Sequence, residues 1–311
     1  MDKLIFDIGA TNTKFALMST DGVILAREKF LTNYESIDTY FQALVDIVDR
    51  YRNLGDEIAI STNGRMTADG NTYRAYIIQF LQGVNLKEEM ERRTGLPVTI
   101  INDGFSAALG EWWKGAGQGY NNLLVIVLGS GMGAGLIING ELYQGSKRNA
   151  AMVFGMLSSY KKEQFEIGGM TTTFALLLYQ LSAMKQLPLE EMTGQRFFDF
   201  VAAGDPVATA MLEAYCENIA TILYNSAQLL DLDRVIITGG LSTRELIINQ
   251  INQKLTQIPS KLMQGSVSEL LKMVAADQDD FLIQATQGTL ALDANLYGAL
   301  YHLLNKEKGV H

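Results

Sequence analysis

The chain has 311 residues, of which 48% are apolar and 19% charged, enough to bury the cores of two lobes of about 100 to 200 residues each. Its formal net charge of -9 argues against a nucleic-acid partner, because an acidic surface repels phosphodiester backbones. The first residues fit neither a signal peptide nor a membrane span, so we expect a cytoplasmic protein without a membrane partner.

Cysteine and histidine are rare. Cys216 is the only cysteine, which excludes an intrachain disulfide and a cysteine-based metal site, and we interpret it as a small core residue of a helix. His302 and His311 both lie in the last ten residues, where chains tend to fray and active sites are seldom built. The sequence therefore predicts chemistry in which histidine is neither acid nor base.

Apolar runs and turn signals alternate in the first half of the chain. They predict an antiparallel meander with strands at residues 3–7, 13–18 and 23–30. A helix at 40–51, strands at 57–61 and 96–101 and a helix at 103–114 are predicted to follow. A second meander is predicted at 122–128, 135–138 and 141–144, again with a glycine-rich turn between its first two strands. This repetition predicts two related lobes.

The second half is predicted to be mostly helical. Helices are expected at 171–184, 193–203, 206–230, 243–255 and 293–305, with one strand at 234–238. There are only four prolines and no linker rich in Ser and Gly, so we expect short crossings between the lobes. The small lobe is expected to comprise residues 1–110 and 291–311, and the large lobe residues 111–290.

The first glycine-rich turn follows Asp7 and connects two strands, unlike the strand-to-helix turns of dinucleotide and P-loop sites. A buried strand rarely ends on a carboxylate that has neither a partner nor a metal. Asp7 could therefore reach Mg²⁺ through a water, and Thr11 could contact a phosphate. An ordinary hairpin turn is the alternative.

Two further turns could hold parts of a ligand. Four glycines in the seven residues 129–135 would let backbone N–H groups face one anion, although a structural hairpin is the alternative. Gly239 and Gly240 end a strand and lead into a predicted helix, whose first amides suit ribose or phosphate oxygens. Lys147 and Arg148 are interpreted as a solvated basic pair, with contact to an anionic group as the alternative.

Asn102 and Asp103 stand at the end of a predicted strand, directly before a predicted helix. Asp103 could cap that helix by accepting hydrogen bonds from first-turn amides. The pattern taken alone favours this cap, with a role as general base as the alternative. The pattern of residues leaves both roles open.

Four segments taken together resemble the ROK family of sugar kinases and repressors, in the hexokinase/actin-like superfamily. They are DIGATNTK at 7–14, IINDG at 100–104, VLGSGMGAGLIING at 127–140 and VIITGGLS at 235–242, and residues 293–304 resemble the family's closing helix. The resemblance implies an α/β, two-lobed actin-like ATPase (ribonuclease H-like) fold with an interlobe cleft. Because the first motif begins at residue 7, we expect no helix-turn-helix module before it, which favours the kinase branch, in particular its zinc-free bacterial β-glucoside kinases.

The resemblance also implies ATP and Mg²⁺ as cofactors, a small carbohydrate as substrate and a homodimer. Asp103 would accept the proton of the attacking sugar hydroxyl, while Asn102 bonds a neighbouring hydroxyl. The nucleotide is expected at Asp7, which reaches Mg²⁺ through water, and at Gly9, Thr11, Lys14, Gly129, Ser130, Gly131, Gly133, Gly239 and Gly240. The sugar is expected at Asn63, Gly64, Asn102, Asp103, Phe105, Val153 and Met156.

The sequence also departs from the family. Residues 157–174 contain no histidine or cysteine, so we expect no structural zinc. Val153 and Met156 replace the glutamate and histidine with which family kinases contact the sugar, Phe105 replaces a common asparagine, and Asn63 and Ala10 replace a proline and a glycine. Hydrogen bonds to charged groups contribute about 1.5 to 3 kcal/mol each, so losing two would weaken a plain hexose roughly 10² to 10⁴-fold.

Two explanations fit these departures. The pocket could take a larger or less polar glycoside, whose aglycone rests on Phe105, Val153 and Met156, or the protein could be a weak or non-catalytic sensor of a sugar or nucleotide. The presence of Asp103 favours an active sugar kinase, whereas Val153 and Met156 favour the sensor. A phosphotransferase similar to acetate kinase is a third alternative.

Overall fold

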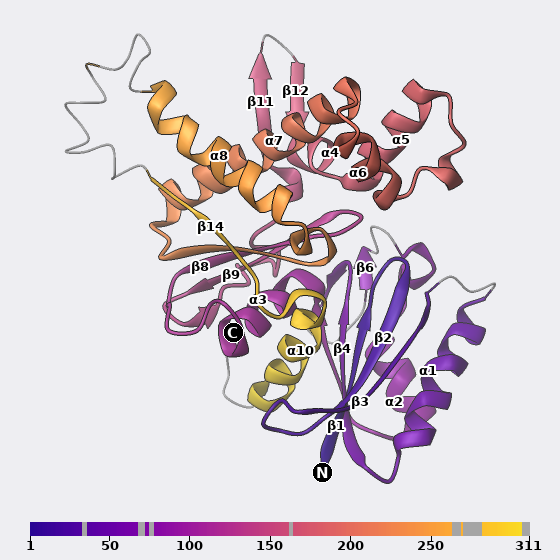
Figure 1. The fold of residues 1–311 in the computed structure, drawn as a ribbon. Helices are drawn as coiled ribbons and strands as arrows, with labels where there is room; N and C mark the ends of the chain where they lie inside the picture. The colour runs from indigo at the N-terminus through magenta and orange to yellow at the C-terminus, as the bar shows by residue number, and fades with distance from the viewer. Residues whose placement is uncertain are drawn as a thin grey trace. The chain divides into compact units, whose positions relative to one another are not determined.

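The computed structural model describes residues 1–32, 36–67, 72–74, 78–161, 164–262, 269 and 282–306 (Figure 1). Contacts divide the chain into two compact units. Unit 1 comprises Met1–Ile126, Ala134–Ala151 and Gly288–His311, and unit 2 comprises Val127–Gly133 and Met152–Gln287. The lobe boundaries expected near residues 110 and 290 stay a prediction.

Unit 1 contains a five-stranded sheet with the order β3-β2-β1-β4-β7. Its strands are β1 (Asp2–Ile8), β2 (Asn12–Met18), β3 (Ile24–Leu31), β4 (Gly55–Thr62) and β7 (Val98–Asn102). β1, β2 and β3 pair antiparallel, which confirms the predicted first meander. β1, β4 and β7 pair parallel, so their carboxyl ends lie at one edge of the sheet.

Helices cover both faces of this sheet. α1 (Ile37–Tyr51) and α2 (Leu86–Thr94) pack on one face, where Leu4, Phe6 and Ile8 of β1 enter a shared apolar core (Figure 1). α3 (Asp103–Lys114) and α10 (Ala294–Asn305) pack together, and α10 contacts β1, β4 and β7. Because side chains alternate along a strand, Asp7 points toward the α10 side, away from that apolar core.

α3 and α10 approach so closely that their crossing requires glycine. A methyl group on Gly298 would lie 1.6 Å from the carbonyl oxygen of Ser106, and one on Gly110 would lie 2.1 Å from that of Ala294. The hydroxyl of Ser106 donates to the carbonyl of Asn295 over 2.7 Å. The first helix after Asn102 and the last helix of the described chain are therefore tightly joined.

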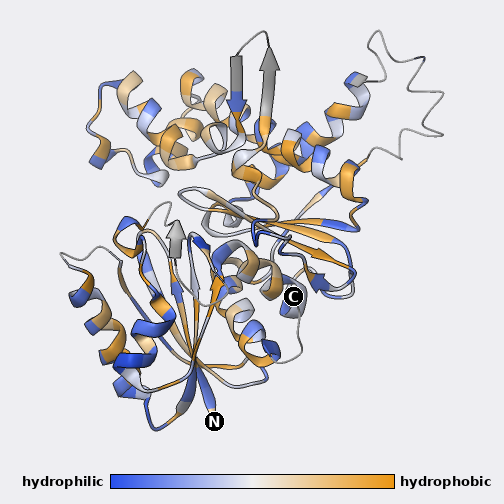
Figure 2. Ribbon diagram, turned by 180° about the vertical axis from the view of Figure 1, so that it is seen from behind, coloured by the Kyte–Doolittle hydropathy of each residue, from blue (hydrophilic) through white to orange (hydrophobic). Residues whose placement is uncertain are grey.

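The second sheet has the strand order β10-β9-β8-β13-β14. Its strands are β8 (Leu123–Leu128), β9 (Met132–Ile138), β10 (Glu141–Leu142), β13 (Arg234–Thr238) and β14 (Ala285–Gln287). β8, β9 and β10 lie in sequence order, as the predicted second meander requires. Figure 2 shows that hydrophobic residues are concentrated in the strands, while the helices mix hydrophobic and hydrophilic stretches.

The helices of unit 2 with described bounds are α4 (Gly168–Thr171), α5 (Phe174–Lys185), α6 (Gly194–Ala202), α7 (Pro206–Leu230) and α8 (Glu245–Leu262). α7 has the predicted bounds, because the Asp205 side chain caps its first turn and Pro206 stands at a position that suits proline. Cys216 is buried in α7, as predicted, and burial raises the pKa of its thiol to about 12. Among the described residues, no helix is both long and apolar enough to span a bilayer.

Several short elements complete the described chain. They are the strands β5 (Arg65–Met66), β6 (Thr72–Arg74), β11 (Leu157–Lys161) and β12 (Gln164–Ile167), and the 3₁₀ helices η1 (Gln79–Leu81), η2 (Val153–Gly155), η3 (Leu189–Glu191), η4 (Gly240–Thr243) and η6 (Ala291–Asp293).

The expectation that both histidines lie in a fraying tail is wrong for His302. This residue belongs to α10 and is half-buried, because the helix packs against the first sheet and α3. Burial, together with the nearby positive charge of Arg148, lowers the pKa of its imidazole to about 4. His311 lies outside the described residues.

Candidate functional site

The candidate site in unit 1 lies at the carboxyl edge of the parallel strands β1, β4 and β7. Asp7 is in register with Ser61, and Thr62 is in register with Asn102. Ligands of open α/β sheets bind beyond this edge, because strand ends and helix starts meet there. The pairing thus gathers Asp7, Asn63 and Asp103 from three distant stretches of sequence.

Asn102 is the N-cap residue of α3. Its Oδ1 accepts hydrogen bonds from the amides of Gly104 (2.9 Å) and Phe105 (3.2 Å), and its Nδ2 donates to the carbonyl of Gly64 (3.0 Å). An N-cap of this kind contributes about 1 kcal/mol to stability. Asn102 therefore performs most of the capping of α3, a role that the sequence left open for Asp103. Its side-chain amide keeps one N–H for another partner.

Asp103 stands one residue further, with both carboxylate oxygens oriented by donors. Oδ1 accepts from the amide of Gly104 over 2.9 Å, and Oδ2 accepts from Nδ2 of Asn63 over 3.3 Å. The side chain is enclosed by protein but keeps part of its surface accessible. This geometry holds a carboxylate at a fixed place while leaving it open to a ligand.

The electrostatics of Asp103 suit proton transfer near neutral pH. Burial raises its pKa to about 6, and the negative charge of Asp7 adds to the increase, while the hydrogen bonds from Asn63 and Gly104 oppose it. At pH 7 the carboxylate is mostly ionised, yet it holds a proton more strongly than a surface aspartate does. Such a pKa is that of an effective general base at neutral pH.

Asp7 is the second carboxylate of the site and is 4% exposed. Its Oδ2 accepts from Nζ of Lys14 over 2.8 Å, and its Oδ1 accepts from Nδ2 of Asn295 over 2.9 Å. Lys14 lies directly opposite Asp7 on β2 and also donates to the carbonyl of Leu292 over 2.8 Å. The buried charge of Asp7 is therefore paired and hydrogen-bonded, as a buried carboxylate must be.

The Asp7 carboxylate fits the expected Mg²⁺, provided that phosphate oxygens supply further ligands to the metal. Mg²⁺ commonly uses one or two carboxylates, several waters and substrate phosphates. Each oxygen of Asp7 already accepts one hydrogen bond and has a further lone pair for a water. Among the described residues, no group of three or more histidine, cysteine, aspartate or glutamate side chains could hold a metal alone. The expected absence of zinc stays a prediction.

Three consecutive residues at the end of β4 carry buried polar atoms that lack partners. Within the described chain, Oγ of Ser61, Oγ1 of Thr62 and Oδ1 of Asn63 make no hydrogen bond. An unsatisfied buried polar atom costs about 1 to 3 kcal/mol, so such atoms point to a bound ligand or water. Ser61 and Thr62 were not among the predicted site residues, although a run of polar residues at the end of an apolar strand was the available signal.

The first glycine-rich turn exposes the side chain of Thr11. The amide of Gly9 donates to the carbonyl of Asn12 over 3.1 Å, which closes the turn between β1 and β2. Thr11 lies at the tip and is exposed, so its hydroxyl is accessible. This arrangement suits contact with a phosphate but is also that of a tight hairpin.

In unit 2, the turn between β8 and β9 contains Gly129, Ser130 and Gly131, whereas Gly133 lies in β9. The amide of Gly129 donates to the carbonyl of Gly131 over 3.0 Å, and the carbonyl of Ser130 accepts from the amide of Ala175. A methyl group on Gly129 would meet no atom within 4 Å. Packing therefore does not require glycine at residue 129, and the open space beside it suits a ligand.

The third turn follows β13. Gly239 has a φ of +92°, and a methyl group on it would lie 2.6 Å from the carbonyl oxygen of Leu128, so both conformation and packing require glycine there. Gly240 begins η4, and α8 begins only at Glu245. The amides next to Gly239 thus belong to a short 3₁₀ helix.

The apolar residues expected at the sugar differ in exposure. Phe105 of α3 is 6% exposed and Val153 of η2 is 3% exposed, so both contribute to packing. Met156 is half-buried, and its carbonyl accepts from the amide of Gly168. Phe105 belongs to unit 1, whereas Val153 and Met156 belong to unit 2.

The chain resembles known proteins over nearly its whole length. The model of the ROK family matches residues 4–154 and 175–293. A beta-glucoside kinase of Listeria monocytogenes is 30% identical over 308 residues, which cover 97% of each chain. A solved structure from the same species, named as a candidate N-acetylmannosamine kinase, is 28% identical with a TM-score of 0.82 and covers 99% of this chain and 100% of its own.

A ROK family glucokinase from Streptomyces griseus, solved with glucose and AMPPNP, has a TM-score of 0.78 at 22% identity and covers 97% of this chain and 98% of its own. This second structural match supports the fold alone, which is the α/β fold of actin-like ATPases, as predicted. The family model and the 30% identical relative both extend across the two units. The chain belongs to the ROK family.

Proposed function

We propose that the protein is a carbohydrate kinase that transfers the γ-phosphate of ATP to a hydroxyl group of a hexose or glycoside, with Asp103 as the general base. The observation that carries this proposal is the Asp103 carboxylate, which donors orient and whose pKa is raised to about 6. As the sugar oxygen bonds to phosphorus, its proton passes to Asp103 and the bond to ADP breaks. Phosphoryl transfer depends mainly on positioning and charge, so one placed base suffices.

The nucleotide is proposed to lie against the glycine-rich turns. The backbone amides of residues 129–131 and the hydroxyl of Thr11 would donate to phosphate oxygens, and Gly239 and Gly240 would face the adenosine. Lys14 spends two of its three N–H groups on Asp7 and Leu292, which leaves one for a phosphate. When bound, Mg²⁺ would neutralise phosphate charge near Asp7.

The sugar is proposed to be a β-glucoside. The relatives named beta-glucoside kinase and candidate N-acetylmannosamine kinase differ in substrate, so family membership alone does not select one. Val153, buried and apolar, offers no hydrogen bond to a sugar, which favours a substrate with an apolar group. The protein is further proposed to be a cytoplasmic homodimer.

A non-catalytic sensor is the second candidate, because Val153 and Met156 provide no charged sugar contact. The unpaired atoms of Ser61, Thr62 and Asn63 fit sugar or water binding in either case. An assay that couples ADP release to a visible signal, run with Mg²⁺ against hexoses, amino sugars and β-glucosides, separates the two. Turnover with any of them supports the kinase, whereas binding without turnover across the set supports the sensor.

A further inference from the structure

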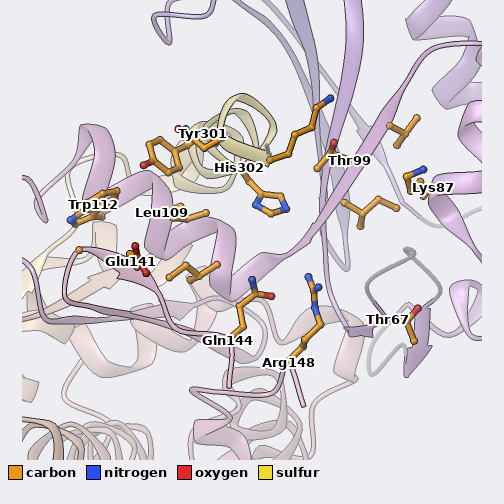
Figure 3. A pocket seen from close by; sticks show the side chains of 16 residues that line it. Thr67, Lys87, Thr99, Leu109, Trp112, Glu141, Gln144, Arg148, Tyr301 and His302 are labelled. Carbon is orange, nitrogen blue, oxygen red and sulfur yellow. Dashed lines mark hydrogen bonds between the residues drawn. The ribbon is translucent and has the colours of Figure 1, made fainter. Parts of the chain in front are cut away.

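A cavity of about 460 Å³ opens in unit 1 beside the edge strand β7 (Figure 3). It is bordered by β7, α3, α10 and the segment from Gly140 to Arg148. Its volume is that of a small-molecule site. None of the residues expected at the nucleotide or at the sugar lines it, so it is separate from the proposed catalytic site.

Three polar side chains converge on this cavity without partners. Figure 3 shows Gln144 and Arg148 pointing into it from one side and His302 of α10 pointing toward them from the other. Gln144 is 8% exposed and His302 is half-buried. Within the described chain, none of the three side chains makes a hydrogen bond or an ion pair, which is costly for the enclosed Gln144 and His302, while Arg148 is exposed.

Basic side chains outnumber acidic ones in the lining of the cavity, with Lys87, Arg148 and Lys306 against Glu141, although the protein as a whole is acidic. Lys87 and Lys306 at the rim already pair with Glu91 and Glu57. Arg148 makes no ion pair within the described chain. Burial and, second, the charge of Arg148 lower the pKa of His302 to about 4, so its imidazole is neutral at pH 7. An anion in the cavity would pair with the charge of Arg148.

The backbone supports a specific role for Arg148. Its φ of +48° lies in the left-handed region, which a long side chain adopts at an energetic cost. Figure 3 shows its guanidinium on the side of the cavity that faces His302. Lys147 is exposed, as Arg148 is, but it does not line the cavity.

We propose that this cavity binds a small phosphomonoester. A guanidinium forms paired hydrogen bonds with phosphate oxygens, and Gln144 and His302 add N–H donors from two elements. Donors on opposite sides suit a tetrahedral group with three terminal oxygens better than a flat carboxylate, which one guanidinium satisfies alone. Leu109, Trp112 and Leu142 line the remainder of the space and would contact the organic part.

Titration calorimetry with glucose 6-phosphate tests this proposal, because that probe joins a phosphomonoester to a hexose. Glucuronate, inorganic phosphate and glucose serve as comparison probes. Glucose 6-phosphate is expected to bind more tightly than all three. If glucuronate binds as tightly, the preference for phosphate is wrong, and if inorganic phosphate binds as tightly, the site takes no organic part.

Variants of the residues that line the cavity test whether the phosphomonoester binds there. Arg148→Gln and His302→Phe should each weaken glucose 6-phosphate about tenfold or more, because the first removes the charge and the paired donors and the second removes the imidazole N–H. Arg148→Lys, which keeps the charge but not the paired donors, should fall between wild type and Arg148→Gln. Lys147→Gln is the matched control and should change affinity less than about twofold.

The outcome for this cavity can be distinguished from the outcome for the proposed kinase activity. Glucose 6-phosphate could also occupy the catalytic site as a product, and in that case Asp103→Asn would affect its binding while Arg148→Gln would not. That pattern would overturn the proposal. If no sugar is phosphorylated but the Arg148 and Lys147 variants differ as expected, the cavity site stands and the kinase function fails.

Discussion

The side-chain amide of Asn63 donates to Oδ2 of Asp103 over 3.3 Å, while its own Oδ1 is buried and has no partner in the described chain. One amide thus orients the proposed base and offers an acceptor that nothing satisfies. An amide introduced in place of the Asp103 carboxyl could still be accommodated, because a rotated Asn63 would present Oδ1 to the new N–H group.

Asp103→Asn should lower turnover about 10² to 10⁴-fold, because an amide cannot accept the proton of the sugar hydroxyl. Stability at pH 7 should stay the same or rise. The folded-state pKa of Asp103 lies above that of the unfolded chain, so folding favours the protonated form, and this contribution is lost as pH rises through about 6. Steady-state kinetics and thermal unfolding measure the two effects.

Asn102→Ala is the matched control for Asp103→Asn. It removes the N-cap of α3 and the bond to Gly64, so the free energy of unfolding should fall by about 1 to 2 kcal/mol. If Asp103→Asn also unfolds early and its folded fraction turns over at the wild-type rate, Asp103 is structural and the proposed mechanism loses its base.

Turnover should depend on pH in the way that the pKa of Asp103 requires. Below about pH 6 the carboxylate becomes protonated and kcat/KM should fall about tenfold per pH unit, whereas above pH 7 it should level off. Initial rates between pH 5 and 8, with folding checked at each pH, provide the measurement. A profile that stays flat down to pH 5 would contradict a general base with this pKa.

Nucleotide with Mg²⁺ should stabilise the protein by about 2.7 kcal/mol at a hundredfold excess over its dissociation constant. Gly129→Ala should reduce this shift, since its methyl group would enter the open space proposed for phosphate while clashing with no protein atom. Without nucleotide, this variant should unfold within about 0.5 kcal/mol of wild type.

Gly239→Ala is the comparison variant for Gly129→Ala, because it changes packing and backbone conformation. Its methyl group would approach the carbonyl of Leu128 to 2.6 Å at a φ of +92°, so it should destabilise the protein even without nucleotide. Thermal-shift titrations of both variants separate ligand binding from packing. An unchanged nucleotide shift in a folded Gly129→Ala protein would remove that turn from the proposed phosphate site.

Lys14→Met should destabilise the protein by about 3 kcal/mol, because it leaves the buried carboxylate of Asp7 with Asn295 as its remaining side-chain donor. Lys29→Met is the control, since Lys29 stands opposite Lys14 on β3 but is exposed. That control should stay within about 0.5 kcal/mol of wild type. Equal effects in urea unfolding would show that the ion pair contributes nothing.

Gly298→Ala should prevent α10 from packing on α3, because the new methyl group would lie 1.6 Å from the carbonyl of Ser106. We expect a loss of more than about 3 kcal/mol, measured by thermal or urea unfolding. Gly194→Ala, in the first turn of α6, has ordinary contact distances and should be neutral or slightly stabilising. A folded Gly298→Ala protein with wild-type stability would mean that α3 and α10 can move apart at little cost in free energy.

Helices and strands were predicted correctly where several local sequence signals agree. α7 combines a cap at Asp205, Pro206 at its start and a long periodic pattern, and its bounds were predicted correctly. α2 was missed, because its sequence LKEEMERRT is mostly charged and buries only Leu86, Met90 and Thr94. β14 was missed because three residues carry too little pattern.

The residues of the candidate site were likewise partly predicted and partly missed. Asp7 was predicted because a carboxylate at the end of an apolar strand needs a partner, whereas Asn102 and Asp103 were assigned to the site by the family resemblance. Asn295 was missed because its bond to Asp7 joins residues far apart in the sequence, and no periodicity records such a pairing. The contact of Ser106 with Asn295 has the same origin.

The position of α10 also has a consequence for the order of biosynthesis. β1, β4, β7 and α3 all leave the ribosome early, but the helix that packs against all four is residues 294–305. Until those residues emerge, an apolar surface of the nascent N-terminal sheet stays bare while the whole of unit 2 is translated. Folding of the amino-terminal half is therefore completed only after residues 294–305 have been translated, and the intermediate that precedes this step is the species that a chaperone would bind.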